Sequence, residues 1–201
     1  ADTAKLDAAG MHAVYLPGVE DMYPKDFLTK VHVDGVSAPL EGEFRPQFFD
    51  GVATVVTKLL LQVLPDKAFS GEKDYQQLQV VKRLARDLDL PLEIVGVPTV
   101  RDEFGLALSS RNAYLSPDQL AVARQLNVIL KDLAAKARTG GDIAQLEEAA
   151  KAQLLTAGFD KVDYCTLRDA TTLRAPEKGD ATRVLAAVWL GQTRLIDNLP
   201  G

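Results

Sequence analysis

Apolar residues recur at helical spacing in two stretches of the first half of the chain. From Phe49 to Val63 they cover a broad face, and Pro65 ends the run, so we expect a largely buried helix there. Tyr75 to Leu88 repeats the same period with polar residues between the apolar ones. Two short runs, Lys67–Phe69 and Glu93–Val97, flank this second helix and predict strands of a parallel sheet. The near-continuous apolar character of Glu93–Val97 predicts that this strand is buried on both faces.

The second half of the chain has a different order of elements. Ser116 as N-cap and Pro117 at the first helical position predict a helix to about Arg138, and a second helix follows from about Asp142 to Ala157. Apolar runs predict three strands of a small antiparallel sheet, the last two as a hairpin: residues 162–167, 183–190 and 193–196. We therefore expect a domain boundary near residue 99, with an α/β domain at 1–99 and a small α+β domain at 100–201.

The N-terminal region is less regular. Residues 1–10 have the pattern of the last turns of a helix, stopped by Gly10, and Met11–Leu16 predicts a strand. No capping signal precedes this helix, so we expect the chain to begin inside an element of a longer parent. Glu20–Tyr23 predicts a helical turn, and Thr29–Val33 a strand with an outward lysine and histidine.

Composition narrows the class of protein. The 201 residues include 23 basic and 28 acidic ones, and the net charge of −5 argues against a nucleic-acid-binding surface. No apolar run is long enough to span a membrane, and the first residues do not resemble a signal peptide. We expect a soluble, cytoplasmic protein with neither nucleic acid nor membrane as a partner.

Four residues that often carry chemistry receive no chemical role from the sequence. Cys165 stands alone, which excludes an internal disulfide and a cysteine-based metal cluster. Cys165 and Trp189 both lie in apolar strand patterns, so we expect them in the core. His12 and His32 are far apart and not spaced as ligands, which favours structural or surface positions. We assign no metal-ligating residue.

The first candidate site is the polar stretch from residue 70 to 77, between the first predicted strand and its helix. Asp74 and Gln77 match the capping-box pattern of a helix start. Lys73 precedes that start, where the helix dipole disfavours a cation unless an anion binds beside it, and Gly71 allows close approach to the backbone. An ordinary capped helix with a solvated lysine explains the same residues.

The second candidate site is the loop around Ser109, Ser110 and Arg111, at the expected domain boundary. Two hydroxyls followed by a guanidinium make a good phosphate clamp, because arginine offers a forked and always charged set of donors. An exposed serine-rich linker is the alternative.

Taken together and in order, these motifs resemble the pantothenate synthetase (pantoate–β-alanine ligase) family. The resemblance extends over essentially the whole chain. It rests on these segments: Tyr23-Pro24, Leu40-Glu41-Gly42, Arg45-Pro46, Phe49–Val52, Gly71–Leu78, Val95–Val100, Gly105–Asn112 and Thr193–Asn198.

The resemblance implies an α/β fold, with a Rossmann-like nucleotidyltransferase domain, incomplete here, followed by a small α+β C-terminal lid domain. It implies a homodimer, with ATP as co-substrate and Mg²⁺ as cofactor. The implied reaction joins pantoate to β-alanine in two steps: pantoate first forms pantoyl adenylate with release of pyrophosphate, and β-alanine then displaces AMP.

The resemblance also implies roles for individual residues. Gly71, Lys73 and Asp74 would lie against ATP, with Lys73 neutralising phosphate charge. Ser109, Ser110 and Arg111 would grip the triphosphate and, with Lys73, form the catalytic set. The backbone around Val100 would contact adenine. The side of the site that binds pantoate would be formed by Gln77, Arg45, Val55 and Val56.

The chain departs from the family pattern in several places. The family's first signature, with its two histidines, and its asparagine-proline-x-glutamine-phenylalanine stretch are both absent, so we expect this chain alone to be inactive or nearly so. Phe48, Ser70 and Phe104 replace a histidine, an aromatic residue and an aspartate. Two alternatives stay open: a non-catalytic nucleotide-binding or dimerisation remnant, and another nucleotidyltransferase family such as a cytidylyltransferase.

Overall fold

A computed structural model describes residues 2–201 and divides into two compact units, Ala1–Lys30 and Val31–Gly201. The first unit contains α1 (Asp2–Ala8) and α2 (Val19–Met22), as the sequence predicts. The strand predicted at Met11–Leu16 is wrong, because this segment pairs with no other strand in residues 2–201. Its apolar side chains are exposed, and an apolar run becomes a strand only where a neighbour completes its backbone hydrogen bonds.

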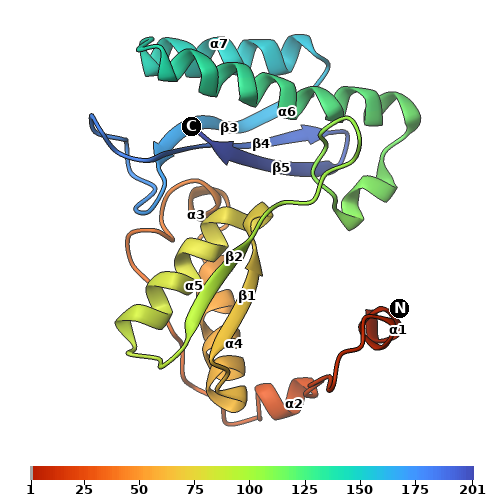
Figure 1. Ribbon diagram of the computed structural model, residues 1–201, viewed down its shortest axis with the longest axis vertical. Helices are drawn as coiled ribbons and strands as arrows, with labels where there is room; N and C mark the ends of the chain where they lie inside the picture. The colour runs from red at the N-terminus through yellow and green to blue at the C-terminus, as the bar shows by residue number, and fades with distance from the viewer. Residues whose placement is uncertain (1) are drawn as a thin grey trace. The chain divides into compact units, whose positions relative to one another are not determined.

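The first part of the second unit packs helices against a two-stranded sheet (Figure 1). β1 and β2 run parallel with Phe69 opposite Val95, which confirms the predicted parallel pairing. The elements are α3 (Glu41–Phe44), α4 (Phe48–Val63), β1 (Lys67–Gly71), the 3₁₀ turn η1 (Glu72–Asp74), α5 (Tyr75–Asp87) and β2 (Glu93–Val97).

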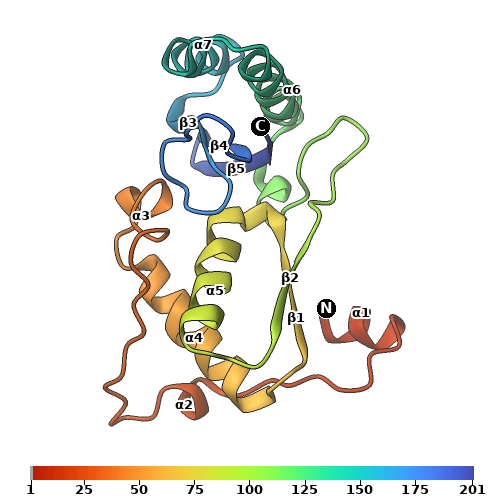
Figure 2. The same ribbon diagram turned by 60° about the vertical axis from the view of Figure 1, so that its left-hand side comes forward.

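Two sequence expectations fail around this sheet. Burial on both faces is wrong for β2, because no residue of this strand is fully buried, Val97 is 40% exposed, and within the second unit helices cover only one face of the β1–β2 pair (Figure 2). The strand predicted at Thr29–Val33 does not form either. The N–H of Val31 donates instead to Thr54 Oγ1 of α4 at 3.0 Å, and Val33 is buried without belonging to a ladder.

The second part of this unit is a three-stranded antiparallel sheet in the order β3–β4–β5, with α6 and α7 on one face (Figure 1). Ser116 and Gln119 form a capping box at the start of α6, and Asp142 caps α7, so local chemistry sets both helix starts. The elements are the 3₁₀ helix η2 (Ser110–Tyr114), α6 (Pro117–Arg138), α7 (Ile143–Thr156), β3 (Lys161–Asp169), β4 (Thr182–Leu190) and β5 (Thr193–Pro200).

Alternation along β4 and β5 gives this sheet two different faces. Val184 and Val188 pack into the core beneath α6 and α7, whereas Leu185 belongs to the second core, formed with α4 and α5. In β5, Leu195 packs under the helices while Arg194 and Ile196 face the other way, toward a cavity. The sheet face opposite α6 and α7 therefore supplies one wall of the site. No helix in residues 2–201 is both long and apolar enough to cross a membrane.

Candidate functional site

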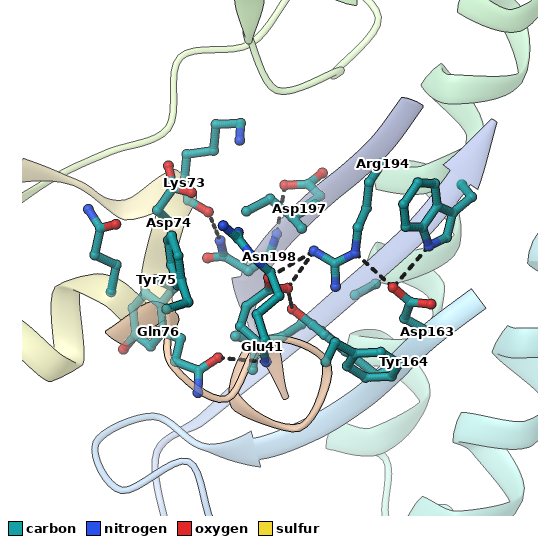
Figure 3. A pocket seen from close by; sticks show the side chains of 18 of the residues that line it. Glu41, Lys73, Asp74, Tyr75, Gln76, Asp163, Tyr164, Arg194, Asp197 and Asn198 are labelled. Carbon is teal, nitrogen blue, oxygen red and sulfur yellow. Dashed lines mark hydrogen bonds and ion pairs between the residues drawn. The ribbon is translucent and has the colours of Figure 1, made fainter. Parts of the chain in front are cut away.

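A cavity of about 550 Å³ lies where the 3₁₀ turn η1 and the helices α3–α5 meet the face of the three-stranded sheet opposite α6 and α7 (Figure 3). This volume is typical of small-molecule sites, which are commonly 300–1,000 Å³. Its lining combines aromatic rings with charged side chains from segments far apart in the sequence. Five of the residues to which the sequence assigns a role line it: Arg45, Lys73, Asp74, Gln77 and Arg111.

Two of the cavity cations form no ion pair in the described part of the chain, although the Asp74 carboxylate also lines the cavity. Among residues 2–201, no carboxylate forms an ion pair with Lys73 or Arg111. The Lys73 side chain points away from the hydrogen-bonded network of the sheet (Figure 3). Two positive side chains held at one cavity in a protein of net charge −5 favour an anionic ligand there.

The capping box predicted for Asp74 and Gln77 is wrong. Asp74 occupies the N-cap position of α5 but makes no side-chain capping hydrogen bond. The 3₁₀ turn η1 runs directly into α5, and the side chains of both residues line the cavity. The pattern that indicates a cap therefore coincides here with two polar groups directed at a ligand site.

The backbone of Lys73 is held by β5. Asn198 Nδ2 donates to the carbonyls of Glu72 at 3.0 Å and Lys73 at 2.9 Å. Arg183 fixes Asn198 in turn, because its Nε donates to Asn198 Oδ1 at 2.8 Å while Nη2 pairs with the Glu72 carboxylate at 3.0 Å. Asn198 is only 3% exposed, so this contact is shielded from water and holds the loop close to the sheet.

The loop that leads to Arg111 is also tied to β5. Arg101 donates twice to the Asp197 carboxylate, at 2.8 Å through each Nη, and also to the carbonyl of Gly105 at 2.9 Å. Asn127 of α6 adds a contact to Asp197 at 3.3 Å. A bidentate arginine–carboxylate pair fixes orientation as well as distance. The segment before Arg111 and the turn that carries Lys73 are therefore both anchored to β5, at the adjacent residues Asp197 and Asn198.

A buried network forms the opposite side of the cavity. Glu41 accepts from the Tyr164 hydroxyl and from Arg194 Nη1, each at 2.8 Å. Arg194 Nε donates to Asp163 at 2.7 Å, and Trp189 Nε1 donates to the same oxygen at 2.9 Å. The ladder skips Asp163 between Val162 and Tyr164, and such a bulge can redirect a side chain.

Burial and charge set the protonation of this network. Burial raises the pKa of the Tyr164 phenol far above its ordinary value, and the Glu41 charge adds to the shift. Burial alone would raise the pKa of Asp163, but hydrogen bonds from Lys161, Arg194 and Trp189 outweigh it and hold that pKa below its usual value. Burial opposes charge on Arg194 too, yet its two carboxylate partners raise its pKa, so the Arg194–Asp163 pair stays ionised.

Gln76 and Gln77 are neighbours in sequence with different surroundings. The Gln76 amide is 4% exposed; its oxygen accepts from the N–H of Glu41 at 3.0 Å and its nitrogen donates to the carbonyls of Val36 and Pro39. It therefore clamps the segment that delivers Glu41. Gln77 lines the cavity and has no such clamp in the described residues.

The other residues assigned from the sequence lie at or outside the cavity edge. Ser109 lines a small adjoining pocket with Lys73 and Arg111, and its hydroxyl accepts from the Arg111 N–H at 3.2 Å. Ser110 begins η2, and Gly71 ends β1 with nothing within 4 Å of a Cβ added there, so its surroundings are open.

Three valines with predicted contacts do not line the cavity. Val100 is 66% exposed after β2, and its carbonyl already accepts from the N–H of Leu108 at 2.9 Å. Val55 and Val56 lie on α4, half-buried, and Val56 packs against the second core. The cavity therefore brings together the charged candidates, whereas the three valines do not belong to its lining.

Two of the three departures from the family pattern stack against arginines. The ring of Phe48 lines the cavity and lies 3.8 Å from the Arg45 guanidinium. Phe104 makes the same contact with Arg124 at 3.9 Å, outside the cavity. Ser70 lies within β1, opposite Gly96.

Sequence reasoning gave no role to the side chains of the buried network or to Asn198. Glu41, Arg194 and Asn198 belong to motifs that carry the resemblance, and alternation along β5 would have placed Arg194 and Asn198 on one face. Trp189 corrects an expectation: it is half-buried at the cavity and bonded to Asp163, since it projects from the face of β4 opposite α6 and α7. Cys165 is in the core as predicted. Within residues 2–201 no cluster of three or more histidine, cysteine or carboxylate side chains could hold a metal ion.

Comparisons with known proteins agree on one family. A family model described as Pantoate-beta-alanine ligase matches residues 1–200. The pantothenate synthetase of Mesorhizobium japonicum is 56% identical over 92% of this chain and 65% of its own length. That of Caulobacter vibrioides is 53% identical over 99% of this chain and 71% of its own length.

Solved structures show the same likeness. Pantothenate synthetase from Thermus thermophilus superposes with a TM-score of 0.91 at 46% identity, over 98% of this chain and 72% of that one. A pantoate-beta-alanine ligase from Francisella tularensis, complexed with "Beta-gamma ATP and Beta-alanine", gives 0.79 at 30% identity, over 99% and 68%. This chain therefore spans between about two thirds and three quarters of the length of most of these relatives, and slightly less of the first.

Proposed function

This chain belongs to the pantoate–β-alanine ligase family, and we propose that the protein condenses pantoate with β-alanine at the expense of ATP, through a pantoyl-adenylate intermediate. The observation that carries the proposal is the pair of cavity cations, Lys73 and Arg111, without carboxylate partners in the described chain and anchored through β5. A triphosphate has the charge that such a pair would neutralise.

The reaction needs positioning more than a covalent catalyst. In the first step an oxygen of the pantoate carboxylate attacks the α-phosphorus of ATP, and the bond to the bridging oxygen breaks as pyrophosphate leaves. In the second step the β-alanine amine attacks the acyl carbon, loses a proton and displaces AMP. Lys73, Ser109, Ser110 and Arg111 would hold the phosphates in line and offset the charge that develops on them.

The remaining roles follow the family assignment. Gly71, Asp74 and the backbone of Val100 would contact ATP. Gln77 and Arg45 would face pantoate, which their position at the cavity supports, and Val55 and Val56 would shape that side from α4. The freedom of Gln77 from a capping role also supports its use for substrate.

The side chains that line the cavity could hold Mg²⁺ only together with the phosphates of ATP, because residues 2–201 contain no cluster of three or more ligands for a metal ion. It commonly binds through one or two carboxylates together with substrate phosphates and waters. Asp74 is a cavity carboxylate without an ion-pair partner in residues 2–201, and it would hold such an ion together with the phosphates. When bound, Mg²⁺ neutralises phosphate charge.

We also propose the finer architecture that the family implies: an incomplete Rossmann-like domain at 1–99, a lid domain at 100–201, a homodimer, and a cytoplasmic location. The parallel β1–β2 pair and the antiparallel β3–β5 sheet support the division at residue 99.

Calorimetric titration with ATP tests the phosphate site directly. Lys73→Ala should weaken ATP binding by about ten- to a hundredfold, since a charged hydrogen bond contributes about 1.5–3 kcal/mol. Lys131→Ala, on the exposed side of α6, is the matched control and should leave binding unchanged. Equal ATP affinity of Lys73→Ala and the unaltered chain would contradict the proposal.

Turnover and base preference separate the alternatives. A non-catalytic nucleotide-binding remnant would bind ATP but form no pantoyl adenylate, whether tested as the 201-residue chain or as part of a longer protein. A cytidylyltransferase would prefer CTP over ATP. The inactivity predicted for residues 1–201 alone is checked by the rate of pantothenate formation. A rate close to that of full-length relatives would refute that prediction.

A further inference from the structure

A second cavity, of about 540 Å³, lies beside α5 and shares no lining residue with the candidate site. Three segments meet there: the loop at residues 34–36, the middle of α5, and the connection between β3 and β4. Most of its lining residues have polar or charged side chains, although much of the exposed wall is made of their apolar atoms. The lining, which we call the α5 groove, consists of Asp34, Gly35, Val36, Gln79, Lys82, Arg83, Arg86, Thr171, Thr172 and Arg174.

The α5 groove concentrates positive charge on an acidic protein. Four of its lining residues are cationic and one is a carboxylate, although the chain as a whole has a net charge of −5. Arg83 and Arg86 share a single acidic partner, Asp87. In residues 2–201 the side chains of Lys82 and Arg174 form no ion pair. The groove lining therefore carries more cations than carboxylates, with Asp87 and Asp169 as the carboxylates in contact with its lining residues.

The turn that carries Arg174 is held in place. Both Thr171 and Thr172 donate backbone N–H groups to Asp169 Oδ1, at 3.2 and 2.6 Å, and the Thr172 hydroxyl donates to the same oxygen at 2.6 Å. Leu173, between Thr172 and Arg174, is fully buried in the second core. A fixed turn presents Arg174 at little further loss of entropy when a ligand binds.

The floor and the acidic edge of the groove restrict what can bind. Gln79 is only 8% exposed, so it adds a largely buried amide to the lining. Asp34 is almost fully exposed at the edge and pairs with His32 at 3.1 Å, which offsets its charge only in part. An occupant should therefore contact the cations of α5 and the Arg174 turn rather than this edge.

We propose that the α5 groove binds the phosphate group of a small phosphorylated molecule or free phosphate. Arginine forks match phosphate oxygens, lysine adds a point charge, and the volume suits a small ligand rather than a single solvent molecule. This binding site is separate from the proposed ATP site and does not depend on it.

Backbone amide NMR on the 201-residue chain tests the proposal with two probes, inorganic phosphate and glycerol 3-phosphate. Each should cause saturable shifts at Thr171, Thr172 and Arg174. Lys82→Gln combined with Arg174→Gln should weaken binding by about tenfold or more. Lys131→Gln with Lys178→Gln removes the same formal charge from exposed positions outside the groove lining, and should leave the affinity unchanged.

The two probes identify the source of the phosphate group, because tighter binding of glycerol 3-phosphate indicates an ester and tighter binding of inorganic phosphate indicates the free anion. Lys73→Ala should leave the groove shifts intact, which separates this site from the ATP site. The proposal is overturned if sodium chloride at equal ionic strength reproduces the shifts, if they appear only around Lys73 and Arg111, or if the double variant binds like its control.

Discussion

The side-chain amide of Asn198 donates to the backbone carbonyl of Lys73 at 2.9 Å, joining the final strand to the loop that carries a cavity cation. Asn198→Ala leaves that carbonyl and the one of Glu72 without this donor, and it also removes the acceptor of Arg183. We expect a loss of about 1–3 kcal/mol in the free energy of unfolding. ATP affinity should fall as well, because the backbone of Lys73 is no longer hydrogen-bonded to β5.

Urea unfolding and calorimetry measure these two effects. Gln192→Ala, an exposed change in the turn between β4 and β5, is the control for both. If Asn198→Ala behaves like Gln192→Ala, the contact with the loop contributes nothing.

The adjacent glutamines of α5 should respond differently to truncation to alanine: one variant should lose stability and the other should lose substrate affinity. Gln76→Ala strands three backbone groups that its amide satisfies, so we expect a stability loss of about 2–3 kcal/mol. Gln77→Ala should change stability by less than about 0.5 kcal/mol and should instead weaken pantoate binding. Denaturant midpoints and substrate titrations of the two variants distinguish them, and equal stability losses would refute the assignment.

Arg194 holds two carboxylates that are largely shielded from water. Arg194→Met leaves Glu41 and Asp163 without their shared cation, and we expect a loss of about 3–5 kcal/mol. Glu41→Gln in the same chain should recover part of that loss, because it removes one of the stranded charges. A double-mutant cycle measures the coupling between Glu41 and Arg194.

The exposed pair Lys136–Asp132 on α6 provides the comparison for that cycle. Its coupling should be no more than about 0.5 kcal/mol. A coupling of similar size for Glu41 and Arg194 would mean that burial adds nothing to their pairing.

His32 should make stability depend on pH near neutrality. Hydrogen bonds to Asp50 and, less strongly, to Asp34 raise its pKa above the ordinary 6.5, so the folded protein binds this proton more tightly than the unfolded chain does. The contribution is fully present below about pH 6.5 and is lost as pH rises through the folded pKa. The imidazole is 55% exposed, so solvent screens the effect.

Unfolding midpoints between about pH 5 and pH 9 test this, together with an NMR titration of the imidazole. His32→Gln should flatten the pH dependence, and His12→Gln should not. A folded pKa at or below the ordinary value would contradict the expectation.

Two glycines should differ sharply when replaced by alanine. A Cβ on Gly42 would overlap the carbonyl oxygen of Ser37, so Gly42→Ala must displace the backbone of the segment that delivers Glu41. We expect a loss of about 3 kcal/mol. Gly51 lies in α4 with nothing within 4 Å of the added carbon, and Gly51→Ala should stabilise the protein by about 0.5–1 kcal/mol. Thermal unfolding of the two variants measures whether each substitution lowers or raises the stability.

Local chemistry explains which elements were predictable from the sequence. Ser116, Pro117 and Gln119 determine where α6 begins through contacts between near neighbours in the chain, and the predicted start is correct. Met11–Leu16 and Thr29–Val33 have strand-like patterns, but a strand also needs a partner, which no pattern within the segment supplies.

The candidate site divides in the same way. Lys73 and Arg111 stand in recognisable polar loops, so their residue types point to phosphate. Glu41 and Arg194 are 153 positions apart, and only the packing of the sheet against α3 brings them together. Their pairing is a tertiary property, which explains why sequence reasoning did not assign it.

The environment of Trp189 makes the cavity observable by optical methods. It is the single tryptophan of the chain, it lines the cavity, and its indole N–H is bonded to Asp163. Intrinsic fluorescence excited at the red edge of absorption therefore comes from one fluorophore at the site of interest. Ligand entry, or loss of the Asp163 contact, should appear as a change in emission maximum and quenching without any attached dye.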